Sequence, residues 1–157
     1  MAYSNADQAG CKDTCRSMTG YAVFFGPNLL SRHSKKQPTV FKSSIEAEYH
    51  TVAYTVGETI WIRKLLHDIG ISIVSPTKVF CDNTNASYMM VNPVQHDRSK
   101  HIAVDYHFVH ERVALGDLVV RYIPTQLQLA DIFTKGLSSK LFEFFRDNLS
   151  VRSSPTD

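Results

Sequence analysis

Residues 43–83 read SSIEAEYHTVAYTVGETIWIRKLLHDIGISIVSPTKVFCDN, and this stretch decides the fold class. The spacing of apolar side chains in its first half predicts a long amphipathic helix that starts at Ser43 and ends before Gly70. These side chains recur at steps of three and four residues, at Ile45, Tyr49, Val52, Val56 and Ile60. In the second half, TKVFCD (residues 77–82) is a short apolar run that is typical of a buried strand. A long helix followed by a buried strand favours a sheet covered by helices.

Shorter elements are expected on both sides of this stretch. Residues 1–42 hold β-prone runs separated by turn residues, which predict a meander of two or three strands. A short helix over 83–91 closed by Pro93, a helix that stops at Gly116 and a strand over 117–123 should follow. Thr125 and Gln128 have capping-box spacing, so the next helix is expected to start at Gln126. With an amphipathic stretch over 140–149, the order indicates one domain over residues 1–150 with a mixed sheet, and a tail over 151–157.

The composition excludes several classes of protein. The chain has 157 residues, 43% of them hydrophobic, so it can bury a sizeable core without disulfides. Its net charge of +2 does not by itself indicate a nucleic-acid partner. Cys11, Cys15 and Cys81 form neither an even set nor a CxxC pair, which argues against a disulfide framework and a zinc ribbon. With no signal-peptide pattern and no membrane-spanning run, we expect a cytosolic or nuclear protein.

Four acidic side chains stand where chemistry is possible. Asp82 follows the strand over 77–82, at the end where open α/β sheets bind ligands, and Asp131 lies near the start of an expected helix. Glu46 and Glu48 lie early in the long helix. Each acid alone is explained as well by a helix cap or by the helix dipole. Together they could converge on one sheet edge, where carboxylates repel one another unless cations join them, and magnesium prefers such oxygen ligands.

Several blocks of the sequence, in order, resemble one protein family. They are YSNADQAGCKDTCRSMTGYAVFFGPNLLS, SKKQPTV, SSIEAEYHTVAY, VFCDNTNASYMMVNPVQHDRSKHIAVDYHFVHERV and RYIPTQLQLADIFTKGL. This series resembles the ribonuclease H domain of copia-type retrotransposon polyproteins, from Tyr3 to about Arg146. The resemblance implies a ribonuclease H-like α/β fold, a five-stranded mixed sheet flanked by helices. It also implies a site for two Mg²⁺ or Mn²⁺ ions that hydrolyses the RNA strand of an RNA·DNA hybrid.

The resemblance places the metal ligands of the family on particular residues of this chain. The acid of the EAEY helix falls on Glu48, with Glu46 as the less favoured choice; the other two surviving acids are Asp82 and Asp131. The fourth position, an acid in the family, is Asn5 here. Asp7 is a possible substitute, on the same face of an extended strand but displaced by about 6.5 Å.

The change at position 5 predicts a degenerate site. An amide supplies one neutral oxygen where a carboxylate supplies charge and can bridge two cations, so metal affinity and rate should both fall. Further departures from the family, at Gln8, Cys15, Arg32 and His33, favour drift in a retrotransposon copy. We predict a ribonuclease H whose activity is weakened or lost. The alternative is a catalytically inactive module that binds hybrid or a protein partner.

Two basic clusters are candidates for contacts with phosphates. One lies around the turn from the β-meander into the long helix, and the other precedes the helix that stops at Gly116. A solvated protein face explains either cluster as well. Their members are Arg32, His33, Lys35, Lys36 and Lys42, and Arg98, Lys100 and His101.

Histidines and aromatic residues carry a weaker signal. Asp105, His107 and His110 form a possible but disfavoured zinc site, since no cysteine lies near them in the sequence. The large aromatic side chains are expected in the core, namely Trp61, Phe133, Phe142 and Phe144.

Overall fold

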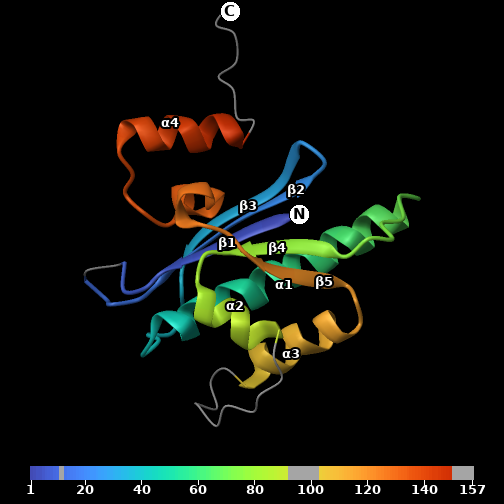
Figure 1. The fold of residues 1–157 in the computed structure, drawn as a ribbon, viewed down its shortest axis with the longest axis horizontal. Coiled ribbons are helices and arrows are strands. Elements are labelled where there is room, and N and C mark those ends of the chain that lie inside the picture. The colour runs from blue at the N-terminus through green and yellow to red at the C-terminus, as the bar shows by residue number, and fades with distance from the viewer. Residues whose placement is uncertain (11–12, 92–102, 150–157) are drawn as a thin grey trace, which may run out of the picture.

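The computed structural model describes residues 1–10, 13–91 and 103–149. Its centre is a five-stranded sheet with the strand order β3-β2-β1-β4-β5 (Figure 1). The strands are β1 (Ala2–Asp7), β2 (Met18–Phe25), β3 (Asn28–Lys36), β4 (Thr77–Cys81) and β5 (Leu118–Tyr122). The β1–β2 and β2–β3 pairs are antiparallel, and β4 lies parallel to both β1 and β5. The expected five-stranded mixed sheet is therefore confirmed.

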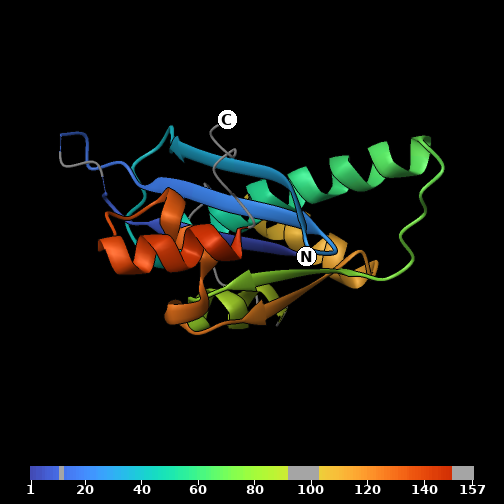
Figure 2. The same cartoon turned by 90° about the horizontal axis from the view of Figure 1, so that it is seen from above.

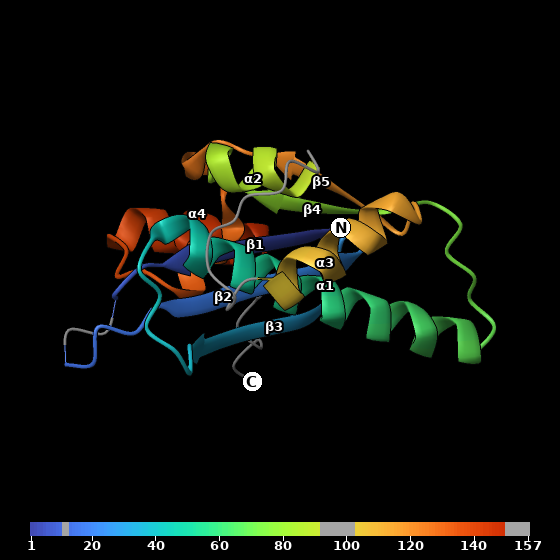
Figure 3. The same ribbon diagram turned by 90° about the horizontal axis from the view of Figure 1, so that it is seen from below.

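Helices cover both faces of this sheet. The helices α1 (Ser44–Asp68), α2 (Thr84–Val91) and α3 (Ala103–Ala114) lie on one face, which Figure 3 shows from below. On the opposite face lie α4 (Ser139–Asn148) and the 3₁₀ turns η1 (Thr125–Leu127) and η2 (Leu129–Phe133); Figure 2 shows α4 from above. Among the described residues, no helix is long and apolar enough to cross a membrane.

The larger core lies between the sheet and α1, α2 and α3. The apolar stripe predicted for the long helix is buried there, with Tyr49, Val52 and Val56 fully enclosed and Ile45 and Ile60 packed at the margin. The smaller core lies under α4 and η2. Because side chains alternate along a strand, β2 serves both cores: its residues Tyr21 and Val23 face the first, and Ala22 and Phe24 face the second.

A buried polar contact fixes the first half of α1 against the sheet. The amide of Gln37, directly after β3, is 2% exposed and donates hydrogen bonds to Thr19 Oγ1, Ala47 O and Thr51 Oγ1 at 2.9–3.1 Å. These bonds join strand and helix at the end of α1 that carries Glu48, so the position of that carboxylate follows the sheet.

One expectation about the elements is wrong. No α-helix starts at Gln126, because the two side chains of the apparent capping box bond elsewhere. Thr125 Oγ1 donates to Asp82 Oδ2 at 3.1 Å, and the buried Gln128 amide donates to Ser4 O at 2.9 Å. The chain forms the two 3₁₀ turns in place of a helix.

The aromatic residues expected in the core are mostly on the surface. Trp61 is 58% exposed on α1, and Phe142 and Phe144 are about half exposed on α4. Phe145 is the fully buried aromatic residue of α4, and Phe133 packs at the margin of the same core. A helix of ten residues that lies on a sheet buries one stripe only, and on α4 that stripe runs through Phe145.

Candidate active site

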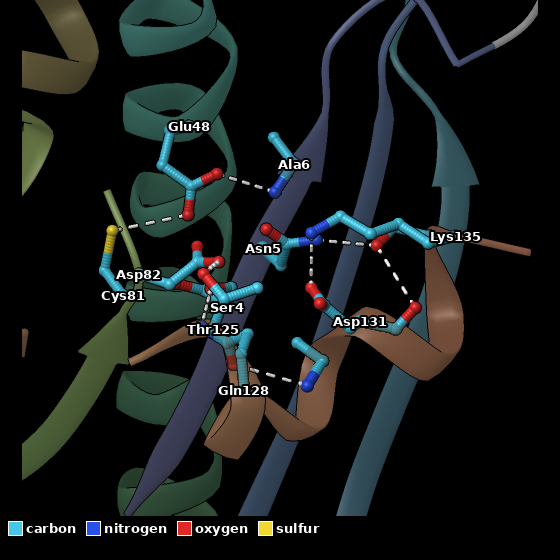
Figure 4. A network of polar contacts seen from close by, with 12 residues as sticks. Ser4, Asn5, Ala6, Glu48, Cys81, Asp82, Thr125, Gln128, Asp131 and Lys135 are labelled. Atoms are coloured by element: carbon cyan, nitrogen blue, oxygen red, sulfur yellow. Dashed lines mark hydrogen bonds and ion pairs between the residues drawn. The ribbon is translucent and has the colours of Figure 1, made fainter. Parts of the chain in front are cut away.

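A pocket of about 360 Å³ opens at the carboxyl ends of the parallel strands β1 and β4. It lies between the first turns of α1 and α2 and the segment that follows η2. Its lining residues are Asn5, Ala6, Ser44, Glu48, Asp82, Asn83, Thr84, Asn85 and Lys135. Three of the residues singled out from the sequence, Asn5, Glu48 and Asp82, therefore line the same pocket (Figure 4).

Asn5 is fixed in this pocket by the segment after η2. It lies in β1 and is 2% exposed, and its Nδ2 donates to Thr134 Oγ1 at 2.7 Å. The Thr134 hydroxyl in turn donates to Asp131 O at 3.4 Å. A carboxylate at position 5 has no proton to donate, so it could keep this contact only if the hydroxyl turned to donate to it.

Glu48 is buried and bonded to two neighbouring strands. Its Oε2 accepts the Ala6 N–H at 2.6 Å, and its Oε1 accepts from Cys81 Sγ at 3.3 Å. Burial raises the pKa of Glu48 to about 8, and the neighbouring charge of Asp82 adds to this rise while the Ala6 hydrogen bond opposes it. Protonation of Glu48 is therefore linked to the other charges of the pocket.

Glu46 has a different place. Its Oε2 accepts from Lys42 N at 3.0 Å, and its own N–H donates to Ser43 Oγ at 3.2 Å. These two bonds close the start of α1 in the manner of a capping box. Glu46 thus serves the helix end, and Glu48 is the glutamate that lines the pocket.

Asp82 is not the cap of α2, although that role was the simplest explanation for it in the sequence. Asn83 Oδ1 accepts the Ala86 N–H at 2.9 Å and caps the helix instead. Asp82 is half-buried, and one of its oxygens accepts from Thr125 Oγ1 at 3.1 Å. Its carboxylate therefore lies beside Glu48 in the pocket wall rather than on the backbone of α2.

Asp131 does not line the pocket, and its side chain is bonded to Lys135, which does. It lies in η2, its side chain is 5% exposed, and its Oδ1 accepts from Lys135 Nζ at 2.9 Å. Burial raises the pKa of Asp131, against the effect of the Lys135 ammonium. In the part of the chain that the structure describes, no three His, Cys, Asp or Glu side chains form a cluster that could hold a metal ion.

Asp7, the possible substitute for an acid at position 5 that the sequence suggested, lies at the end of β1 outside the pocket. Its carboxylate lies beside Gly10, in the turn after the strand. Its charge still contributes to the raised pKa of Asp131. Asp7 thus acts on the site at a distance in this arrangement.

The first basic cluster lies on the sheet edge. Arg32, Lys35 and Lys36 are exposed on β3, the outer strand, and Lys42 is exposed before α1. Charged side chains on an outer strand also prevent pairing with other chains. His33 differs from them, because its ring stacks between Tyr21 and Tyr54 at centroid distances of 5.4 and 5.6 Å.

The remaining candidate residues are the second basic cluster and the possible zinc ligands. Arg98, Lys100 and His101 lie outside the described residues. Asp105 pairs with His50 at 2.7 Å, and neither lines the pocket. The rings of His107 and His110 pack on Tyr106. These contacts give the three candidate zinc ligands other partners.

Three residues of the site were not anticipated from the sequence. Lys135 brings a positive charge into the pocket, Thr134 holds Asn5, and Cys81 donates to Glu48. Lys135 had a local signal, since it stands four residues after Asp131 in LADIFTK and such a spacing pairs opposite charges. The contacts of Thr134 and Cys81 join residues 129 and 33 positions apart, and no local pattern announces them.

Comparison with known proteins relates this chain to part of a polyprotein. It is 47% identical over 154 residues to the retrovirus-related Pol polyprotein from transposon RE1 of Arabidopsis thaliana, a match that covers 98% of this chain and 10% of the polyprotein. The chain thus spans about a tenth of the length of the curated relatives it matches. No family model matches it.

Solved structures share the fold at low sequence identity. LC11-RNase H1 in complex with an RNA/DNA hybrid has a TM-score of 0.60 and 19% identity, over 85% of this chain and 91% of that one. The foamy viral protease-reverse transcriptase in complex with an RNA/DNA hybrid has a TM-score of 0.57 and 16% identity, over 85% of this chain and 19% of that one. At such identities the likeness establishes the ribonuclease H-like fold alone.

Proposed function

Because this chain belongs to the copia-type retrotransposon Pol polyproteins, as a region with the ribonuclease H-like fold, we propose that it binds RNA·DNA hybrids and hydrolyses their RNA strand with weakened activity. The observation that carries the proposal is the meeting of Asn5, Glu48 and Asp82 in one pocket at the strand ends. Glu48 and Asp82 keep the acids of the family, whereas Asn5 stands where the family has an acid.

The donor set of the pocket fits a divalent cation. Two carboxylates and an amide oxygen are ligands that Mg²⁺ accepts. The charge of Asp82 raises the pKa of Glu48, so a cation between them would relieve a repulsion that already exists. Asp131 is bonded to Lys135, and the donors that line the pocket therefore suit one ion. A second ion would need Asp131 as well.

Within the proposal each residue has a distinct part. Glu48 and Asp82 would hold Mg²⁺ or Mn²⁺, and Asn5 would add one neutral oxygen. When bound, such an ion activates water and stabilises the leaving oxygen of a phosphodiester. Ala6 and Cys81 orient Glu48, and Thr125 orients Asp82, before any ligand arrives. The chain thus supplies a fixed acidic pocket with one negative charge fewer than its family.

Contacts with the hybrid would come from the basic side chains. Arg32, Lys35, Lys36 and Lys42 are exposed and suited to phosphates, which position a nucleic acid without reading its sequence. Arg98, Lys100 and His101 stay in the proposal as a second group.

A buried free thiol at Cys81 agrees with a reducing compartment, the cytosol or nucleus.

Restoring the acid at position 5 tests the proposal. Asn5→Asp should raise Mg²⁺-dependent or Mn²⁺-dependent cleavage of a labelled hybrid by one or more orders of magnitude, because the restored carboxylate completes the four-acid set. Hybrid binding in EDTA should change little. The measurement compares wild type, Asn5→Asp and the control Asp82→Asn at equal concentration. If wild type cleaves as fast as Asn5→Asp, the proposed weakening is wrong.

A module without catalysis is the second candidate. Two contacts favour it: the Asn5 amide is committed to Thr134, and Lys135 neutralises Asp131. Binding of hybrid by both proteins without cleavage by either would support this candidate over the enzyme.

A further inference from the structure

We propose that Lys135 is an internal counter-ion of the pocket, whose ammonium holds Asp131 and competes there with a divalent cation. This inference rests on the proposed function, because it concerns the same acidic pocket. Its consequence is that Lys135 must leave Asp131 before Oδ1 of that carboxylate can bind a metal ion.

The first observation is the position of Lys135. It follows η2, and Figure 4 shows its side chain reaching back from that turn toward Asn5 with the ammonium bonded to Asp131. The 2.9 Å distance from Nζ to Oδ1 is that of a charge-assisted hydrogen bond. Lys135 also lines the pocket with Glu48 and Asp82, and its charge acts on Glu48 as well as on Asp131.

The charges of the site show what the ammonium does there. Glu48, Asp82 and Asp131 carry three negative charges when ionised, and Lys135 carries one positive charge. The ammonium lowers the pKa values of both Glu48 and Asp131, against the burial that raises them. It therefore stabilises the ionised acids in the way that a bound cation would.

The two partners differ in their freedom to move. The side chain of Asp131 is 5% exposed, whereas that of Lys135 is 34% exposed on a flexible stem. The backbone of Asp131 is held by Lys135 N–H at 3.0 Å and by the Thr134 hydroxyl that Asn5 contacts. Asp131 thus stays in place while the ammonium can swing into solvent.

Removal of the ammonium should therefore strengthen the binding of metal ions. Lys135→Met keeps much of the length of the side chain and removes its charge. We expect its dissociation constant for Mn²⁺, measured by calorimetry without nucleic acid, to fall roughly tenfold. Lys64→Met is the matched control, because it makes the same change of net charge at an exposed position of α1 roughly 24 Å along the helix from Glu48.

Stability in EDTA gives a second readout. Lys135→Met leaves the buried Asp131 carboxylate without its partner, so its melting temperature should fall below that of wild type in EDTA. Added Mn²⁺ should then raise the melting temperature more than it does in wild type. If the variant unfolds in EDTA, Mn²⁺ should refold it, and Lys135→Gln replaces it in the titration.

The outcomes separate this inference from the proposed function. An Mn²⁺ affinity of Lys135→Met within twofold of wild type, or no Mn²⁺ binding by any of the proteins, would overturn the counter-ion role. Hybrid binding in EDTA is measured on the same preparations. A protein that gains Mn²⁺ affinity through Lys135→Met but fails to bind hybrid contradicts the proposed function and supports the role of Lys135.

Discussion

Under the proposed function, Asn5 is one residue that would change the chemistry of the site while the surrounding elements stay in place. Its amide donates to Thr134, its neighbour Ala6 donates to Glu48, and both contacts come from the same strand. Replacement of an acid by an amide preserves the volume of the side chain and removes one negative charge. We therefore expect the arrangement of elements to persist in such a replacement while the affinity for cations falls.

Glu48 gives a prediction about pH. Its pKa is about 8 in the folded protein against an ordinary value of 4.5, so the folded state binds the proton more tightly than the unfolded chain does. The contribution of Glu48 to stability is thus complete below about pH 4.5 and is lost as the pH rises toward 8. Within this window the free energy of unfolding should fall by up to ~1.4 kcal/mol per pH unit.

Chemical denaturation in EDTA at several pH values measures this slope. Glu48→Gln should reduce it, because glutamine cannot ionise, and should make the protein more stable than wild type at pH 8. Glu46→Gln serves as the control, since Glu46 lies at the end of the helix. An unchanged slope in Glu48→Gln would show that Glu48 does not titrate in this window.

At the scale of elements, the close approach of β2 and η2 places Asp131. Gly20 is the point of contact: a Cβ there would lie 2.6 Å from Thr134 Cγ2 and 2.9 Å from Phe133 Cβ. These atoms belong to the segment that also holds Asn5 and carries Lys135. The absence of a side chain at Gly20 therefore allows this part of the pocket to pack on the sheet.

We predict that Gly20→Ala lowers the free energy of unfolding by ~1–3 kcal/mol, because the segment around Phe133 must shift. Gly57→Ala is the matched control. Gly57 lies inside α1, where a Cβ would meet no other atom within 4 Å, and alanine there should stabilise the helix by up to ~1 kcal/mol. Thermal and urea unfolding of both variants measure the difference. A neutral Gly20→Ala would mean that η2 is free to move away from β2.

At the scale of the whole molecule, the net charge is small, but the charged side chains gather in separate regions. The net charge is only +2, yet Arg32, Lys35 and Lys36 are exposed together on the outer strand β3. Glu48 and Asp82 lie in a pocket at the ends of β1 and β4. A nucleic acid bound at this protein would therefore meet separate basic and acidic regions, and its affinity should depend on local charge.

The salt dependence of hybrid binding tests this distribution. The affinity in EDTA should fall as salt rises, because bound phosphates release counterions. The double variant Lys35→Ala, Lys36→Ala should weaken binding and reduce the slope of log affinity against log salt by about 2, because each lysine that binds a phosphate contributes about 1 to the slope. Lys64→Ala should leave the slope unchanged. Equal slopes in wild type and the double variant would exclude these two lysines from the interface.

The sequence by itself determined the long helix, the strand that follows it and the family. The apolar period of residues 43–69 predicted a helix that the structure places at Ser44–Asp68, and TKVFCD predicted a strand that it places at Thr77–Cys81. The helix and the strand each depend on residues that are close together in the chain. The sequence therefore contains the whole pattern that predicts them. The series of family blocks pointed to Asn5, Glu48 and Asp82, which the fold brings to one pocket.

Only the tertiary structure decided which polar side chains serve the site and which serve the backbone. Thr125 and Gln128 match a capping box, but they bond to Asp82 and Ser4, 43 and 124 positions away. Asn83 rather than Asp82 caps α2, and the exposure of Trp61 depends on which face of α1 meets the sheet. A hydrogen-bonding group takes the partner that folding brings nearest, and for the Thr125 hydroxyl and the Gln128 amide nitrogen that partner is remote in the sequence.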